Sequence, residues 1–214
     1  MRKLILKMHM SVDGFVGGPN GEVEWVFKSL DPAPTDWIVQ SIGQAGVHIM
    51  GRKTFFDMAA YWPTSSEPYA KPMNEIPKLA FSRKGLDQGQ RTELTRAFAD
   101  VTRKNEAQGI KPNPASAAVI KEWADTPILT GDLATEIKRL KQQPGKDILA
   151  HGGAGFARSL VKEGLIDEYQ LMLHPVALGQ GLPLFSTLAK PMDLKLVSSQ
   201  AFETGAVAQV YRPA

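Results

Sequence analysis

The stretch that decides the fold is VHIMGRKT, residues 47–54, because it reads as a short apolar strand that ends in a glycine turn and leads into a helix. A second stretch, DILAHGGAG at residues 147–155, has the same order of features. Glycine lets a backbone approach a ligand closely, and a helix N-terminus offers free N–H groups at the positive end of a dipole. Two such turns predict a ligand with more than one phosphate, such as a dinucleotide, and dinucleotides usually carry redox chemistry.

Apolar runs alternate with helix-compatible segments along the rest of the chain. Leu133, Ile137 and Leu140 fall at i, i+4 and i+7, which is one face of a helix. Alternating strands and helices predict an α/β fold with a mostly parallel sheet covered on both faces, and the last two runs predict an antiparallel hairpin. The expected strands are residues 4–11, 47–50, 78–81, 127–129, 147–150, 168–174, 194–197 and 207–211, and the expected helices are residues 37–42, 54–60, 131–143 and 155–162.

The composition excludes several classes of protein. The chain has 214 residues, no cysteine and a formal net charge of +3. Without cysteine there is no disulfide framework, thiolate metal site or thiol nucleophile, and we expect a cytoplasmic protein. The small, dispersed positive charge argues against nucleic-acid binding, and no run of about 18 apolar residues predicts a membrane span. The four scattered histidines predict no metal site.

One segment interrupts the alternation. Residues 86–127 are mostly polar and contain a Gly- and Pro-rich stretch at 109–114. Their apolar content is too small for a separate hydrophobic core. We therefore expect one domain over residues 1–214, with an insertion at about residues 86–127.

Several short motifs follow one another along the chain: SVDG at 11–14, GRKT at 51–54, FSR at 81–83, GGAG at 152–155 and HPVALGQG at 174–181. In this order they resemble the dihydrofolate reductase-like superfamily, and they are closest to the C-terminal reductase domain of the bifunctional riboflavin-biosynthesis deaminase-reductases and its stand-alone relatives. The resemblance covers most of the chain outside residues 86–127. It implies a three-layer α/β/α fold with a mixed sheet, an NADPH site and a homodimer.

The resemblance implies a division of the cofactor site. The turn at 51–54 would bind the cofactor phosphates, and the turn at 152–155 would lie under the pyrophosphate. Arg83 would hold the adenosine 2′-phosphate, since a guanidinium binds phosphate with two parallel hydrogen bonds. Cations are unfavourable at a helix start unless an anion is present, which favours a ligand at Arg52 and Lys53. The implied cofactor-binding residues are Gly14, Gly51, Arg52, Lys53, Thr54, Ser82, Arg83, Gly152, Gly153, Ala154 and Gly155.

Four residues are candidates for the substrate side: Ser11, Asp13, Trp25 and Asp36. Asp13 is the candidate catalytic residue, as a carboxylate that orients or protonates a heterocycle; the alternative is a turn former before glycine. Asp36 falls where dihydrofolate reductases place an acidic residue, but an N-cap is the preferred reading. Trp25 either lines the pocket or fills the core. His151, next to the second turn, either touches a ligand or is structural.

The sequence thus predicts an NADPH-dependent reductase that transfers a hydride to a C=N or C=O bond of a small, planar, pterin- or pyrimidine-like substrate. The His/Cys zinc pattern of a deaminase is missing, so the substrate need not be the riboflavin precursor. The alternative is a nucleotide-binding protein without turnover. For the homodimer, the apolar Leu171, Leu173 and Val176 are expected to contribute an edge.

Overall fold

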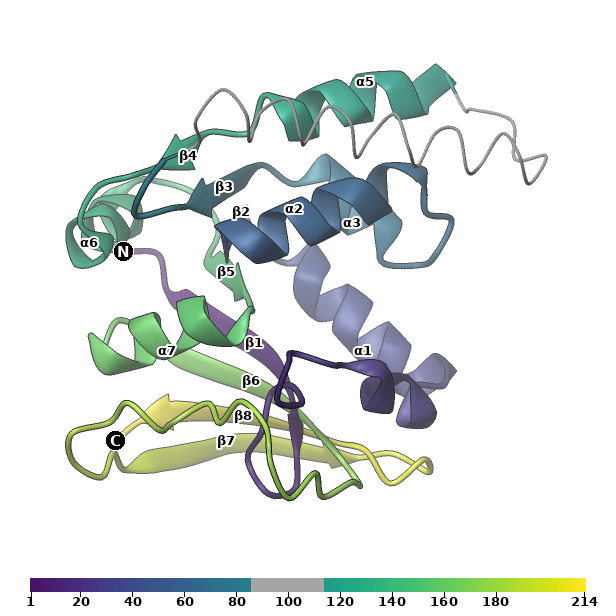
Figure 1. Cartoon of the computed structure of the whole chain (residues 1–214), viewed down its shortest axis with the longest axis vertical. Coiled ribbons are helices and arrows are strands. Elements are labelled where there is room, and N and C mark those ends of the chain that lie inside the picture. The colour runs from purple at the N-terminus through teal and green to yellow at the C-terminus, as the bar shows by residue number, and fades with distance from the viewer. Residues whose placement is uncertain (86–113) are drawn as a thin grey trace.

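The computed structural model describes residues 1–85 and 114–214. Its strands are β1 (Leu4–Ser11), β2 (Val47–Gly51), β3 (Lys78–Phe81), β4 (Ile128–Leu129), β5 (Ile148–His151), β6 (Glu168–His174), β7 (Leu194–Ala201) and β8 (Val207–Pro213). They form one sheet of order β4-β3-β2-β5-β1-β6-β8-β7 (Figure 1). Strands β1 to β6 pair in parallel, and β8 pairs antiparallel with both β6 and β7. The predicted mostly parallel sheet with an antiparallel C-terminal pair is confirmed.

Helices cover both faces of the sheet. They are α1 (Pro32–Gly43), α2 (Arg52–Tyr61), α3 (Ala70–Glu75), α5 (Pro114–Ala124), α6 (Leu133–Gln142) and α7 (Ala154–Lys162), with 3-10 helices η1 (Glu24–Ser29) and η2 (Trp62–Thr64). Ile38 of α1, Phe55 of α2 and Trp123 of α5 are buried in one apolar cluster. Ile137 of α6 and Leu160 of α7 belong to a second cluster. The sheet therefore separates two cores, as a three-layer α/β/α fold requires.

Local signals explain where two of the helices begin. Helix α1 starts one residue after Asp31, whose carboxylate accepts the Ala33 N–H, and Pro32 occupies the first helical position. The expected cap at Asp36 is wrong: Asp36 lies inside α1 and is exposed, because proline at N1 moves the start to residue 32. Helix α6 begins after Asp132, which accepts the Thr135 N–H.

Part of the segment expected to be an insertion belongs to the layered fold. Residues 86–113 lie outside the described residues, whereas α5 connects toward β4 within the layer that contains α2. Trp123 of α5 is fully buried, stacks on Phe55 at 5.9 Å and donates its indole N–H to Asn74 Oδ1. One aromatic side chain thus anchors a helix that the polar composition of the segment concealed.

The sheet order corrects the expected dimer edge. Strand β6, which carries Leu171 and Leu173, lies between β1 and β8, and Leu171 is buried. The free edge on that side is β7, where Leu196 and Val197 are exposed. Within residues 1–85 and 114–214, no helix is long and apolar enough to cross a membrane.

The topology creates a crevice between β2 and β5. These strands pair in parallel, so their carboxyl ends lie at the same edge of the sheet. The helix that follows β2 packs on one face and the helix that follows β5 packs on the other. Ligands of open α/β sheets bind at such a switch point, outside the carboxyl ends of the strands.

Candidate active site

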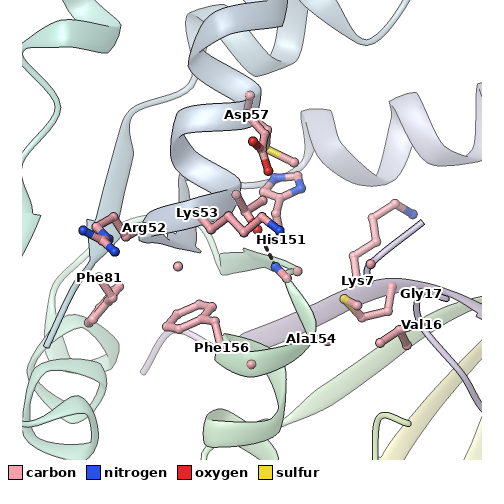
Figure 2. A pocket seen from close by; sticks show the side chains of 18 of the residues that line it. Lys7, Val16, Gly17, Arg52, Lys53, Asp57, Phe81, His151, Ala154 and Phe156 are labelled. Carbon is pink, nitrogen blue, oxygen red and sulfur yellow. Dashed lines mark hydrogen bonds between the residues drawn. The ribbon is translucent and has the colours of Figure 1, made fainter. Parts of the chain in front are cut away.

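A cavity of about 1430 Å³ opens at this edge of the sheet. A pocket for one drug-sized ligand measures about 300–1,000 Å³, so this cavity has room for a dinucleotide and a small substrate together. Figure 2 shows Arg52, Phe81 and Phe156 on one side, Lys7 and Gly17 on the other, and His151 between them. The cavity therefore joins the two glycine turns to residues of β1.

The two glycine turns are held together by a hydrogen bond. The Gly153 N–H donates to Thr54 Oγ1 at 2.6 Å, although the residues are 99 positions apart. All residues of 51–54 and 152–155 line the cavity, as do Ser82 and Arg83. Ten of the eleven predicted cofactor-binding positions thus meet at one site, and the eleventh, Gly14, is not among the described residues that line it.

Close packing explains why glycine occupies these turns. A Cβ at Gly51 would lie 2.8 Å from Phe156 Cβ. A Cβ at Gly152 would lie 2.9 Å from Met8 Sδ, and one at Gly153 2.9 Å from Thr54 Oγ1. Glycine at these positions therefore allows the turns to pack directly against Phe156, Met8 and Thr54.

The two helices that follow the glycine turns lack side-chain caps. Both α1 and α6 start with an aspartate that binds a backbone N–H, whereas α2 starts at Gly51 and α7 at Gly153 without such a bond. The first N–H groups of α2 and α7 are thus left for a ligand. Arg52 and Lys53 lie in the first turn of α2, so an anion at this place offsets an otherwise unfavourable pair of cations.

Lys7 is a cavity residue that the sequence reading missed. It lies in β1, is 8% exposed, and its Nζ has no hydrogen-bond partner among the described residues. Burial lowers the pKa of the Lys7 ammonium group to about 7. The sequence feature that could have identified Lys7 is a lysine within an otherwise apolar strand. An unpaired cation at such a position costs free energy unless a ligand or an aromatic ring compensates the charge.

His9 also lines the cavity from β1. Its Nδ1 lies 2.8 Å from Nε2 of His174, and His174 Nδ1 lies 2.7 Å from Ser29 Oγ. Burial lowers the pKa of His9 to about 3 and that of His174 to about 4. No local pattern in the sequence indicates that the two rings touch, since they are 165 positions apart.

His151 and His48 form a second buried pair. Their rings meet edge to face with centroids 4.6 Å apart. His151 lines the cavity, and its Nε2 has no hydrogen-bond partner among the described residues. Burial, and then the neighbouring His48 and Lys7, hold the pKa of His151 well below its usual value. His151 is therefore neutral at physiological pH.

Asp13 is engaged by its own loop. Its carboxylate accepts the Ser11 hydroxyl at 2.6 Å and the N–H groups of Leu178 and Gly179, the latter at 2.7 Å. The hydrogen bond from Ser11, followed by that from Gly179, lowers the pKa of Asp13. Asp13 and Ser11 are not among the described residues that line the cavity. This geometry matches the alternative role of Asp13 as a residue that shapes the turn.

The other two substrate candidates also lie away from the cavity lining. Trp25 is 8% exposed, donates its indole N–H to the Glu22 carbonyl and meets the His174 ring edge to face at 5.4 Å. Asp36 is exposed on α1. Neither is among the described residues that line the cavity. In the same part of the chain, no group of three His, Cys, Asp or Glu side chains is placed to hold a metal ion.

Known proteins share this architecture. The chain is 30% identical over 210 residues to the uncharacterised protein YyaP of Bacillus subtilis strain 168. The aligned residues make up 98% of this chain and 94% of YyaP. A pyrimidine reductase-like protein of Corynebacterium diphtheriae superposes with a TM-score of 0.62 at 15% identity, over 100% of this chain and 92% of that chain.

A deaminase and 5-amino-6-(5-phosphoribosylamino)uracil reductase of Thermotoga maritima gives a TM-score of 0.64 at 16% identity, over 100% of this chain and 57% of that chain. These likenesses establish the dihydrofolate reductase-like fold. The family model of the RibD C-terminal domain matches residues 2–208. The resemblance seen in the motifs is thereby confirmed, and the chain belongs to the RibD C-terminal domain family.

Proposed function

We propose that this protein is an NADPH-dependent reductase that transfers a hydride to a small, planar, pyrimidine- or pterin-like substrate. The observation that carries the proposal is the pair of uncapped helix N-termini, joined by the Thr54–Gly153 hydrogen bond, at one cavity. Family membership supports the reductase class, and the reductase names of the Corynebacterium and Thermotoga proteins support the substrate class.

The residues around the glycine turns fit a dinucleotide with several phosphates. The turns at 51–54 and 152–155 line the cavity, and the helices that follow them begin with backbone N–H groups that no side chain caps. Arg52, Lys53 and Arg83 line the same part of the cavity and supply positive charge. A bound nicotinamide supplies the hydride, and the chain supplies the binding and orientation.

The residues of β1 suit a polar, planar ring. Lys7 and His9 are two positions apart in a strand, so their side chains lie on the same face of the sheet. The apolar residues Val26, Ile38 and Ile42 also line the cavity and would suit the faces of a planar ring. We assign substrate orientation to Lys7 and His9 rather than to Asp13, because an ionised carboxylate that already accepts several hydrogen bonds is a poor proton donor.

The test is a titration with NADPH and NADH followed by a turnover screen. The screen measures loss of NADPH absorbance with 5-amino-6-(5-phosphoribosylamino)uracil, its dephosphorylated form, dihydrofolate and small carbonyl compounds. Gly153→Val is the matched negative control, because its side chain would collide with Thr54 Oγ1 and disturb the contact between the two turns; circular dichroism checks that the variant folds. NADPH-selective binding with turnover of one compound supports the proposal. Binding without any turnover favours the non-catalytic nucleotide-binding alternative, and no binding refutes both.

We further propose that the protein forms a homodimer through β7. This strand is eight residues long, lies at the edge of the sheet and is almost entirely exposed. Leu196 and Val197 are large apolar residues at 49% and 45% exposure. Sedimentation at micromolar concentration is expected to give a dimer that Val197→Lys converts to a monomer. A wild-type monomer would contradict the proposal.

A further inference from the structure

Three polar side chains from distant segments are linked by hydrogen bonds into a row that ends at the cavity. Ser29 closes η1, His174 closes β6 and His9 lies in β1. Ser29 is 4% exposed and His174 1% exposed, while His9 is partly exposed in the cavity wall. The hydrogen bonds run from Ser29 Oγ to His174 Nδ1 and from His174 Nε2 to His9 Nδ1. Among the described residues, His9 Nε2 is the one ring nitrogen of the pair without a protein partner.

The hydroxyl group of Ser29 determines which atoms donate and which accept in these hydrogen bonds. The Ser29 hydroxyl has a single hydrogen-bond partner among the described residues, His174 Nδ1. A buried O–H that donates to nothing pays a desolvation cost, so the hydroxyl is expected to donate to Nδ1. His174 then carries its proton on Nε2 and donates to His9 Nδ1. His9 in turn carries its own proton on Nε2, the nitrogen left for the cavity.

The surroundings keep both imidazoles uncharged. Burial is the main cause of the lowered pKa of His9, and the neighbouring His174 and Lys7 act in the same direction. Burial alone lowers the pKa of His174. A second proton on His9 would also break these hydrogen bonds, since its Nδ1 would become a donor facing the Nε2–H donor of His174. The pair is therefore held in one neutral tautomer.

We propose that Ser29 and His174 position His9 as a neutral donor whose Nε2–H binds an acceptor atom of the substrate. The identity of the ligand as a substrate rests on the proposed reductase function, whereas the tautomer of His9 does not. With Lys7 on the same face of β1, the site offers two donors spaced about 7 Å along the strand. Such a pair fits a ring with acceptor atoms on two edges, as in a pyrimidine with carbonyl oxygens.

The first arm of the test measures the tautomers directly. Long-range proton–nitrogen NMR spectra of the ¹⁵N-labelled full chain at pH 7 separate Nε2–H from Nδ1–H imidazoles. We expect His9 and His174 both to be Nε2–H tautomers in the wild type. Ser29→Ala should abolish the single tautomer of His174, while Ser41→Ala, which removes a hydroxyl bonded to Gln170 elsewhere, should not. An Nδ1–H tautomer of His9 in the wild type overturns the proposal.

The second arm measures turnover with NADPH and the compound from the screen that is reduced. His9→Gln keeps an N–H donor near the Nε2 position, and His9→Phe keeps only the ring. We expect His9→Phe to lower kcat/KM about tenfold, the value of one hydrogen bond, and His9→Gln to recover most of that loss. Equal losses in both variants overturn the donor role. If no compound is reduced, the proposed function is refuted, and so is the contact between His9 and a substrate. The NMR measurement still tests the tautomer of His9 independently.

Discussion

The ammonium nitrogen of Lys7 lies 4.0 Å from the centroid of the Trp37 ring. This cation–π contact is the only compensation that the described residues give to Lys7 Nζ, which has no hydrogen-bond partner among them. Such a contact is worth about 0.5–2 kcal/mol, less than the cost of burying an unpaired charge. Without a ligand, the buried ammonium group of Lys7 therefore destabilises the folded protein.

Lys7→Met is expected to stabilise the protein without ligand. The pKa of Lys7 is depressed in the folded state, from 10.5 to about 7, so the unfolded state binds more protons between these values. The free-energy cost of burying the Lys7 ammonium group is therefore complete below pH 7 and decreases as the pH rises toward 10.5. We expect a gain in the free energy of unfolding of roughly 2–4 kcal/mol at pH 6 and a smaller gain at pH 9, measured by urea denaturation.

Lys78→Met is the matched control for this experiment. Lys78 is also buried and lies over a tryptophan, Trp123, at 4.8 Å, but its Nζ donates to the carbonyls of Met73, Asn74 and Ile76. Its removal leaves these acceptors without their partner, so this variant should lose stability at both pH values. Loss of stability in Lys7→Met as well would show that Lys7 has a partner in solution.

Glycine at position 51 is expected to be required for packing. A Cβ there would lie 2.8 Å from the Phe156 Cβ, and neither atom can move without a backbone shift. Gly51→Ala should lower the free energy of unfolding by about 1–3 kcal/mol, the usual cost of overpacking. Gly155→Ala should have the opposite sign, because no atom lies within 4 Å of the Cβ position and alanine is a better helix former than glycine in the first turn of α7. Equal effects of the two variants in thermal denaturation would contradict this account.

The local signals in the sequence were sufficient to predict the glycine turns, the parallel strands and the apolar face of α6. Each depends on residues within one element: an apolar run, a glycine or a 3.6-residue period. The helix α5 was missed because its anchor is a single residue, Trp123, within a polar segment. Its burial depends on Phe55 and Asn74, which no local pattern connects to it.

The substrate side of the site was harder to predict than the cofactor side. Asp13 was expected to face the substrate, but its hydrogen-bond partners Leu178 and Gly179 come from a turn more than 160 positions away. The same distance separates His9 from His174. Contacts of this kind arise from the pairing of β1 with β6, so they follow from the topology of the sheet and not from the motif itself.

Arg83 is expected to distinguish NADPH from NADH. It lines the cavity after β3, beside the turn at 51–54, and the 2′-phosphate is the part of the cofactor that a guanidinium recognises best. Arg83→Ala should weaken NADPH binding by about 1.5–3 kcal/mol, or roughly 10- to 150-fold, and leave NADH binding nearly unchanged. Arg139→Ala, which breaks an exposed ion pair with Glu136 on α6, is the control. Equal weakening of both cofactors, measured by tryptophan quenching, would contradict the assignment.

The four histidines, of which His48, His151 and His174 are buried, are expected to make the protein sensitive to acid. Burial lowers the pKa of His9 to about 3 and those of His48 and His174 to about 4, and holds the pKa of His151 well below 6.5. The unfolded state therefore binds more protons below pH 6.5, so stability is complete above this pH and is lost as the pH falls toward 4. At pH 5 the buried His48 and His174 each cost roughly 2 kcal/mol, a large fraction of the stability of a typical domain.

Urea denaturation at pH 7.5 and 5.5 measures this loss, and its slope with pH counts the protons taken up on unfolding. His48→Phe keeps the aromatic contact with His151 but cannot take up a proton, so it should reduce the average slope over this interval by about half a proton. His48 is suited to this substitution because its Nδ1 has no partner among the described residues and its bond to the Ile42 carbonyl is long, at 3.4 Å. A free energy of unfolding that stays constant between the two pH values would mean that these imidazoles titrate freely in the folded protein.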